Sequence, residues 1–222
     1  MKALITVSGR VSAMKMRAAY ARPMGVAVLL GLMILGGCAL PEKPLRPAVY
    51  DFGPGLTSAT SDRLAAGMPA LALAEVEAPA ALDSTAVLYR LAYADARQLR
   101  PYAQARWSMT PAQLLRQRLR EALAQQRPVL NAGEGGGNTL LRVELEEFSQ
   151  LFEAPERSVG LLRLRATLLS VGPTGERLLA QRSVVVQRPA TAADAAGGVR
   201  ALAQASDAAT TELVQWLQQQ GR

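Results

Sequence analysis

Polar and apolar residues alternate most clearly in the second half of the chain, in segments 139–148, 159–171 and 177–187. In the first of these, Leu141, Val143 and Leu145 fall on one face, while Glu144 and Glu146 fall on the other. Alternation with a period of two is typical of strands that have one buried and one solvated face. The three segments therefore predict three neighbouring strands of one sheet.

A turn and several shorter strands complete the predicted sheet. Pro173-Thr174-Gly175 separates the second and third alternating segments, which predicts an antiparallel meander. Shorter apolar runs predict strands at 49–52, 71–76 and 87–93. The Arg-rich segment between Tyr93 and Trp107 is expected to contain a hairpin.

A first amphipathic helix is expected to begin at Thr110-Pro111, where a capping residue precedes a proline in the first turn. It should end before Pro128. Leucines recur on one face, while Arg116 and Arg120 fall elsewhere. The arginines are interpreted as a solvated helix face rather than a binding patch.

A second helix is predicted from about Asp194 or Val199 to Gln219, and Gly197-Gly198 is expected to delay its start. Its buried stripe repeats at spacings of three and four residues, at Val199, Leu202, Ser206, Ala209, Leu213 and Trp216.

The beginning of the chain has the pattern of an export signal. Gly25–Leu35 is an uncharged run of 11 residues, whereas a helix that spans a bilayer needs about 20. Lys15, Arg17 and Arg22 precede the run, and no acid occurs before Glu42. A basic flank followed by a short apolar run predicts a secretory signal peptide.

Leu35-Gly36-Gly37-Cys38 follows the apolar run and resembles the lipobox of bacterial lipoproteins, whose cysteine is acylated and cut free on its amino side. We therefore expect residues 1–37 to be the signal peptide and Cys38 to be a lipid anchor. Three acyl chains on Cys38 would hold the protein stably in the membrane, because each buried CH₂ contributes about 0.8 kcal/mol. An ordinary buried thiol is the alternative. Ala39 follows the cysteine. Lipoproteins kept in the inner membrane commonly have Asp at this position, so the resemblance points to the outer membrane.

Composition narrows the chemistry that the chain can perform. Removal of residues 1–37, which hold five basic residues and no acid, lowers the formal charge from +7 to +2. A charge this small, together with export, argues against nucleic acid as a partner. Histidine is absent, which removes the commonest general base and transition-metal ligand. The sequence predicts no catalytic, cofactor-binding or metal-binding residue, and no enzyme.

Two further motifs suggest chemistry but have simpler interpretations. Residues 131–138 are Gly-rich, but a phosphate loop needs Lys and Ser or Thr after its last glycine. This segment is interpreted as a flexible turn. Glu144, Glu146 and Glu147 lie close together in sequence, but the first two share a strand face with Arg142. A salt-bridged solvent face is preferred to an acid–base pair.

The mature chain divides into a tether and one domain. Residues 38–49 hold Cys38 and a Pro-rich segment with Pro41, Pro44 and Pro47, and an extended polyproline segment over 39–49 spans about 34 Å. We interpret it as a tether from the anchor, with a Pro-rich ligand for a partner as the alternative. Residues 50–222 are long enough for one domain with its own core, without a disulfide.

The order of motifs carries a family resemblance. A lipobox and a Pro-rich tether precede Tyr50-Asp51-Phe52-Gly53-Pro54, then come the segment 76–83, Ala105-Arg106-Trp107 before a helix, a strand meander and a terminal helix. This order resembles the ABC-type transport auxiliary lipoprotein family, whose best-known type is paraquat-inducible protein C. The resemblance covers residues 38 to about 218. The Tyr-Asp-Phe start departs from the Tyr-Tyr-Thr-Leu that is more usual there.

The resemblance implies an α+β fold, with a mixed, mainly antiparallel sheet and two helices packed on one face, similar to the amino-terminal domain of the Tol-system propeller protein. It also implies a periplasmic, outer-membrane lipoprotein that docks the mammalian-cell-entry (MCE) component of a lipid transporter, beside its ABC permease and ATPase. Arg106 and Trp107 would mark a family-typical surface, although a Trp before a helix is more often a core residue.

Two alternatives from other classes stay open. The domain itself could carry a lipid between its sheet and helices, or the protein could be a structural lipoprotein that organises the outer membrane or cell wall without a transport role. Self-association, the transported molecule and the start methionine are also left open by the sequence.

Overall fold

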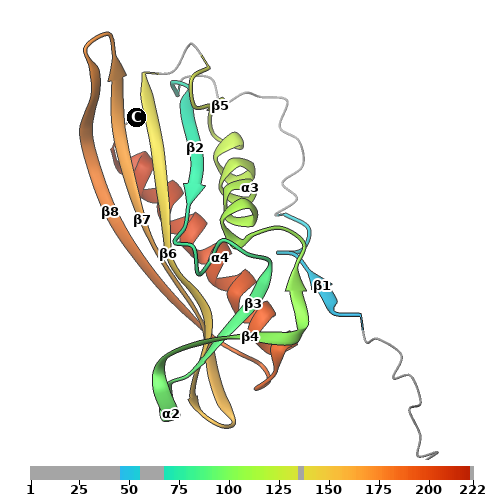
Figure 1. Ribbon diagram of the computed structural model, residues 1–222. Helices are drawn as coiled ribbons and strands as arrows, with labels where there is room; N and C mark the ends of the chain where they lie inside the picture. The colour runs from blue at the N-terminus through green and yellow to red at the C-terminus, as the bar shows by residue number, and fades with distance from the viewer. Residues whose placement is uncertain (1–45, 56–67, 135–137, 221–222) are drawn as a thin grey trace, which may run out of the picture. The chain divides into compact units, whose positions relative to one another are not determined.

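The computed structural model describes residues 46–55, 68–134 and 138–220. Figure 1 shows these residues as an open sheet with helices packed against it. The elements are β1 (Ala48–Tyr50), β2 (Leu71–Glu77), β3 (Ala86–Leu91), α2 (Ala92–Asp95), β4 (Ala96–Trp107), α3 (Pro111–Ala124), β5 (Val129–Asn131), β6 (Thr139–Ala154), β7 (Arg157–Gly172), β8 (Gly175–Pro189) and α4 (Ala195–Gln219).

The sheet is mixed and is organised around the long strand β6. β6 pairs in parallel with β2 and β3 along one edge and antiparallel with β7 along the other. β7 pairs antiparallel with β8, which confirms the predicted meander. β4 pairs antiparallel with β3, while β1 pairs in parallel with β4 and β5 in parallel with β2. The eight described strands therefore end in three edge strands, which are β1, β5 and β8.

The predicted hairpin between Tyr93 and Trp107 is wrong, because β4 runs as one strand from Ala96 to Trp107. The chain reverses earlier, in the single helical turn α2, where the Asp95 carboxylate accepts a hydrogen bond from the Arg97 backbone N–H. Pro101 lies opposite Leu88 of β3, and β1 reaches only residues 105–107, so the other edge of β4 is unpaired at Pro101, where proline is tolerated.

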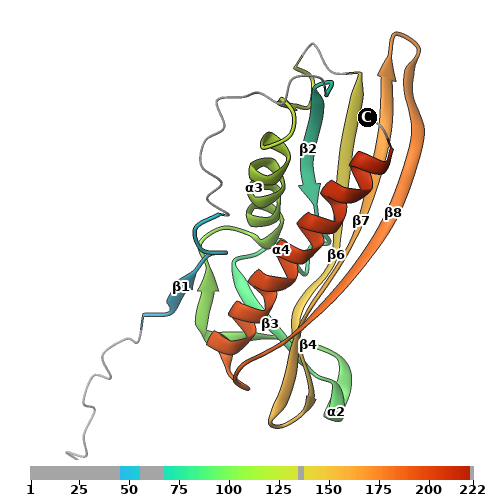
Figure 2. The same cartoon turned by 180° about the vertical axis from the view of Figure 1, so that it is seen from behind.

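Both longer helices lie on one face of the sheet. Figure 2 shows α4 crossing β6, β7 and β8, with α3 beside it over β2. α3 begins at the predicted Thr110 cap, which forms a capping box with Gln113. α4 begins at the earlier of its two expected starts, and Asp194 caps it through a hydrogen bond from the Gly197 N–H.

Gly197 and Gly198 do not delay α4, contrary to expectation. A Cβ on Gly198 would lie 2.0 Å from Oε1 of Gln150, so the helix approaches β6 closely only because this residue has no side chain. Gly160 on β7 has the same effect further along, since its Cβ would lie 2.6 Å from the backbone of Ala201. The first turns of α4 are therefore pressed directly onto the sheet.

The core lies between the sheet and the two helices. The inward faces of the meander contribute side chains that are almost fully buried, among them Leu141, Val143, Leu145, Leu162, Leu164 and Leu168. The helices contribute the predicted stripe of α4 and the leucines of α3, including Leu115, Leu119 and Leu213. The apolar faces of the strands and the apolar stripes of the helices thus form one core, as the sequence predicts.

Candidate functional site

The chain enters the folded domain at β1. Residues 39–45 of the predicted tether, like Cys38 and the predicted signal peptide, lie outside the described residues. The strand predicted at 49–52 is confirmed as β1, but it begins at Ala48, within the predicted tether, and ends at Tyr50. Val49 lies opposite Arg106 of β4. The Ser108 N–H continues the ladder with a 2.7 Å hydrogen bond to the Tyr50 carbonyl. The extended tether would therefore end at Pro47.

An aromatic cluster holds the residues after β1. Phe52 packs edge-on against Trp107, with ring centroids 5.6 Å apart, and lies 5.9 Å from the ring of Phe148. Its side chain thus reaches the core between β4 and β6, where an aromatic ring typically buries about 150–250 Å². Trp107 is 2% exposed and is a core residue, while its neighbour Arg106 is exposed.

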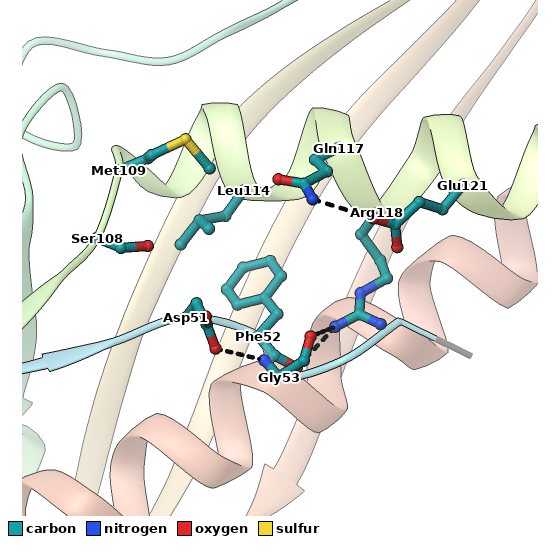
Figure 3. Close-up of a pocket in the computed structure, with 9 residues that line it drawn as sticks. All are labelled: Asp51, Phe52, Gly53, Ser108, Met109, Leu114, Gln117, Arg118 and Glu121. Carbon is teal, nitrogen blue, oxygen red and sulfur yellow. Dashed lines mark hydrogen bonds between the residues drawn. The ribbon is translucent and has the colours of Figure 1, made fainter. Parts of the chain in front are cut away.

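Arg118 of α3 closes the site from the other side, as Figure 3 shows. Its Nη2 donates hydrogen bonds to the carbonyls of Phe52, at 2.6 Å, and Gly53, at 3.2 Å. Its Nε lies 3.3 Å from a carboxylate oxygen of Asp207 on α4. We call these four residues the clamp, because one buried guanidinium joins the N-terminal segment to both helices.

The charges of the clamp are only partly compensated. Burial raises the pKa of Asp207, the Arg118 guanidinium opposes that rise, and the nearby Glu121 carboxylate adds to it. Thr210 on the next turn of α4 has a buried hydroxyl with no hydrogen-bond partner. A buried ion pair becomes costly when one partner is removed, because the other charge then stays in a poorly solvated place. The clamp is therefore sensitive to single substitutions.

A small polar cavity of about 100 Å³ lies beside the clamp, between the 51–53 segment and α3. Met109 and Leu114 line it together with Gln117 and Glu121, and Figure 3 shows these side chains around it. Sites for small organic ligands usually occupy about 300–1,000 Å³, so this cavity has room for a few water molecules rather than a lipid.

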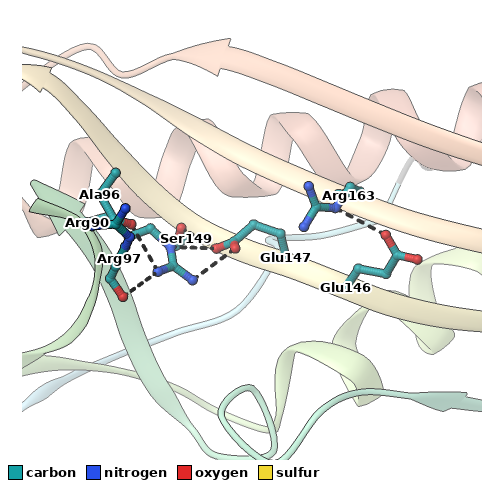
Figure 4. Close-up of polar contacts among 7 residues, drawn as sticks. All are labelled: Arg90, Ala96, Arg97, Glu146, Glu147, Ser149 and Arg163. Atoms are coloured by element: carbon teal, nitrogen blue, oxygen red, sulfur yellow. Dashed lines mark hydrogen bonds and ion pairs between the residues drawn. The ribbon is translucent and has the colours of Figure 1, made fainter. Parts of the chain in front are cut away.

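A second polar cluster fastens the β3–α2–β4 unit to β6 (Figure 4). The Arg90 guanidinium donates to both carboxylate oxygens of Glu147, at 3.3 and 3.0 Å, and to the carbonyls of Ala96 and Arg97. Ser149 donates a 2.6 Å hydrogen bond to the same carboxylate. Every contact is internal to the domain, which indicates a structural role.

Two adjacent glutamates of β6 have different partners. A register shift in the β6–β7 ladder falls between Leu145 and Glu147, and after it Glu147 lies opposite Arg163 and Phe148 opposite Leu162. Glu147 is 8% exposed, because Arg90 covers its carboxylate. Glu146 instead pairs with Arg163, at 3.1 Å, and Arg165, at 2.6 Å, on the outer face. Glu144 also lies 3.9 Å from Arg165, so the salt-bridged face predicted for Glu144 and Glu146 is confirmed, and Glu147 forms an ion pair with Arg90 instead.

The arginines of α3 do not form a freely solvated face. Arg118 is buried, and Arg116 and Arg120 both donate to the side-chain oxygen of Asn131, at 3.1 and 2.6 Å. Hydrogen bonds from the backbone and side chain of Asn131 lower the pKa of Glu134, with a further contribution from Arg120. These contacts fasten the described start of the Gly-rich segment to α3.

Residues 46–55, 68–134 and 138–220 contain neither a metal-binding cluster nor a membrane-spanning helix. No three acidic or cysteine side chains there lie close enough together to hold a metal ion. None of the helices in the same residues is long and apolar enough to cross a membrane.

Arg118 is the functional residue that sequence reasoning missed. It follows Leu114 by four residues and Leu115 by three, so it lies within the apolar stripe of α3 rather than opposite to it. A charged residue inside a buried stripe indicates a buried partner, and that signal was available. Its partners, two carbonyls and an acid on α4, could not be predicted because they are far apart in sequence.

Comparison with known families decides the relationship that the motif order suggested. A family model described as the ABC-type transport auxiliary lipoprotein component matches residues 50–214. The chain belongs to this family. The match begins in β1 and ends in α4, so all four clamp residues lie within the family domain of this auxiliary lipoprotein. The family model describes a lipoprotein that is an auxiliary component of transport.

Two solved structures share the fold of this auxiliary lipoprotein. The protein XCC0632 from Xanthomonas campestris superposes with a TM-score of 0.65 at 22% identity, over 78% of this chain and 96% of that one. A second structure, of an uncharacterized protein, has a TM-score of 0.59 at 17% identity, over 78% of this chain and 99% of that one. No curated protein gave a significant match.

Proposed function

We propose that this auxiliary lipoprotein is anchored in the outer membrane by acylated Cys38 and docks the periplasmic MCE component of an ABC-type lipid transporter. Residues 1–37 would serve as the signal peptide and the segment from Cys38 to Pro47 as the tether. The observation that carries the proposal is the family match over most of the folded domain, residues 50–214. We also propose that the fold of this domain is similar to that of the amino-terminal domain of the Tol-system propeller protein.

The clamp supports an anchored role for the domain. A protein held by its N-terminal lipid must bear load where the tether meets the fold. Here Phe52 is inserted in the core and the carbonyls of Phe52 and Gly53 are held by buried Arg118. The N-terminal segment is therefore attached by more than the three-residue strand β1.

The core argues against the alternative in which the domain carries lipid between sheet and helices. That space is filled by side chains such as Leu115, Leu141, Leu164 and Leu213, each 0% exposed. Protein interiors packed in this way leave few voids larger than a water molecule. A docking role, in which lipid passes through partner proteins, fits this core better than a carrier role.

The test is a crosslinking pull-down of the full-length protein from membranes, with partners identified by mass spectrometry. The matched control is Cys38→Ala, which alters the anchor and leaves residues 46–220 unchanged. Recovery of an MCE protein with the wild type, and its reduction with the control, is the expected result. Recovery of only cell-wall or outer-membrane assembly proteins would overturn the docking proposal in favour of a structural lipoprotein.

A further inference from the structure

The longest unpaired edge in the described residues belongs to β8. This strand pairs with β7 along one side only, and Figures 1 and 2 show it at the outer margin of the sheet with no element beside it. α4 covers its inward face, where Arg182 pairs with Glu212 at 2.6 Å, but not its edge. Backbone N–H and C=O groups along such an edge are available to another strand.

The middle of β8 lacks the usual protection against strand pairing. Residues 183–187 read Ser-Val-Val-Val-Gln, without a charge or a proline, and Val185 is 58% exposed. Leu178, near the start of the strand, is also 58% exposed. Natural edge strands are commonly short or carry charges, prolines or inward-pointing polar groups. A long β-branched edge with exposed apolar side chains is suited to accept a partner strand.

The charges of β8 indicate what kind of strand would fit. Glu176 pairs with Arg142, and Arg182 pairs with Glu212. Arg177 and Arg188, both exposed, have no carboxylate partner among the described residues. These two cations lie on either side of the uncharged middle, about 37 Å apart at the rise of an extended strand.

We propose that the β8 edge binds an extended segment of another protein by strand addition, and that this segment has an apolar middle with acidic residues at both ends. The acids would pair with Arg177 and Arg188, and the middle would cover Val185. An identical β8 would instead bring two further unpaired cations to the same edge, so a second copy is the less favourable occupant. The proposal does not depend on which transporter the protein serves.

The test uses the full-length protein in detergent and a labelled peptide of about thirteen residues, which matches the length of the edge. The peptide alternates threonine and valine and has two glutamates at each end. A control peptide has lysines in place of the glutamates. Fluorescence anisotropy should show binding of the glutamate peptide at least about tenfold tighter than the lysine peptide, a difference of about 1.4 kcal/mol.

Variants locate the binding at the edge. Val185→Glu should weaken binding of the glutamate peptide at least about tenfold, while Val49→Glu, at an exposed position of the distant edge strand β1, should leave it unchanged. In the double variant Arg177→Glu and Arg188→Glu, the preference should reverse toward the lysine peptide. Hydrogen exchange in 183–187 should slow when the peptide is bound. Circular dichroism checks that each variant is folded.

Three results would overturn the proposal: no binding of either peptide, equal binding of both, or self-association that Val185→Glu abolishes without any peptide binding. The last would assign the edge to a second copy of this chain. A failed MCE pull-down would not change any of these outcomes, so the two proposals are tested separately.

Discussion

Replacement of Arg118 by Met is the most direct test of the clamp. Methionine keeps the apolar stem of the side chain and removes the guanidinium. Two hydrogen bonds, to the carbonyls of Phe52 and Gly53, and the contact with Asp207 are lost together. The substitution therefore separates the N-terminal segment from α3 without opening a large cavity.

The expected cost follows from these contacts. Hydrogen bonds to a charged group typically contribute about 1.5–3 kcal/mol, and loss of one partner of a buried pair costs about 3–5 kcal/mol. The Asp207 side chain is 38% exposed, so water screens part of its charge. We expect Arg118→Met to lower the free energy of unfolding by about 2–4 kcal/mol.

The pH dependence provides a second signature. The folded-state pKa of Asp207 lies above its unfolded value of 3.8. The stability that protonated Asp207 contributes is therefore fully present below pH 3.8 and is lost as pH rises through the folded pKa. Arg118 is the group that opposes this rise. Without Arg118 the pKa should rise further, and the cost of the substitution should be larger at pH 7 than near pH 4.

Urea denaturation of four proteins measures the coupling: wild type, Arg118→Met, Asp207→Asn and the double variant. The double variant should recover about 1–2 kcal/mol relative to the sum of the single costs. Native-state hydrogen exchange around Tyr50 should also be faster in Arg118→Met than in the wild type. If the costs add within about 0.5 kcal/mol and do not change between the two pH values, then Arg118 and Asp207 are not coupled and the clamp is wrongly described.

Three further predictions concern the rest of the fold. Gly160→Ala should lower the free energy of unfolding, measured in urea, by about 1–3 kcal/mol, because the added Cβ would meet the backbone of Ala201. The control Gly172→Ala should be neutral, because no atom lies within 4 Å of its Cβ position. Equal effects would contradict the close approach of α4. Glu147→Gln should cost about 1–3 kcal/mol through Arg90, and the exposed control Glu144→Gln less than about 0.5, by the same measurement. Burial, with smaller effects of Tyr89 and Asp194, raises the pKa of Tyr102 to about 12. An absorbance titration should therefore show one tyrosine that ionises near that pH, and Tyr102→Phe should remove this transition. The stability of the wild type should fall as pH rises from 10 toward 12.

Alternation and capping were sufficient to predict most elements. Leu141, Val143 and Leu145 alternate with charged residues because one face of β6 meets the helices and the other meets water. Thr110 and Asp194 cap their helices as local sequence predicts. These features depend on neighbours in sequence, which is why a single sequence reveals them.

The clamp and the Arg90–Glu147 cluster depend on contacts between distant residues. Arg118 is 66 residues from the carbonyl of Phe52 that it holds, and Arg90 is 57 residues from Glu147. Regular alternation would place Glu147 on the core face with Leu145, but a register shift in β6 puts Phe148 on that face and Glu147 opposite Arg163. Sequence periodicity predicts which face a residue occupies only while the ladder stays regular.

β1, next to the clamp, and the β8 edge lie at opposite ends of one path through the sheet. From β1 the path runs through β4, β3, β6 and β7 to β8, which amounts to about 24 Å at ordinary strand spacing. α4 supplies a partner to each region, Asp207 to Arg118 and Glu212 to Arg182 of β8, but these are different side chains. Mutations at distant sites with separate partners usually have additive effects. Arg118→Met should therefore weaken attachment at β1 without changing peptide binding at β8, and loss of both from that one substitution would indicate unfolding of the domain rather than damage to either site.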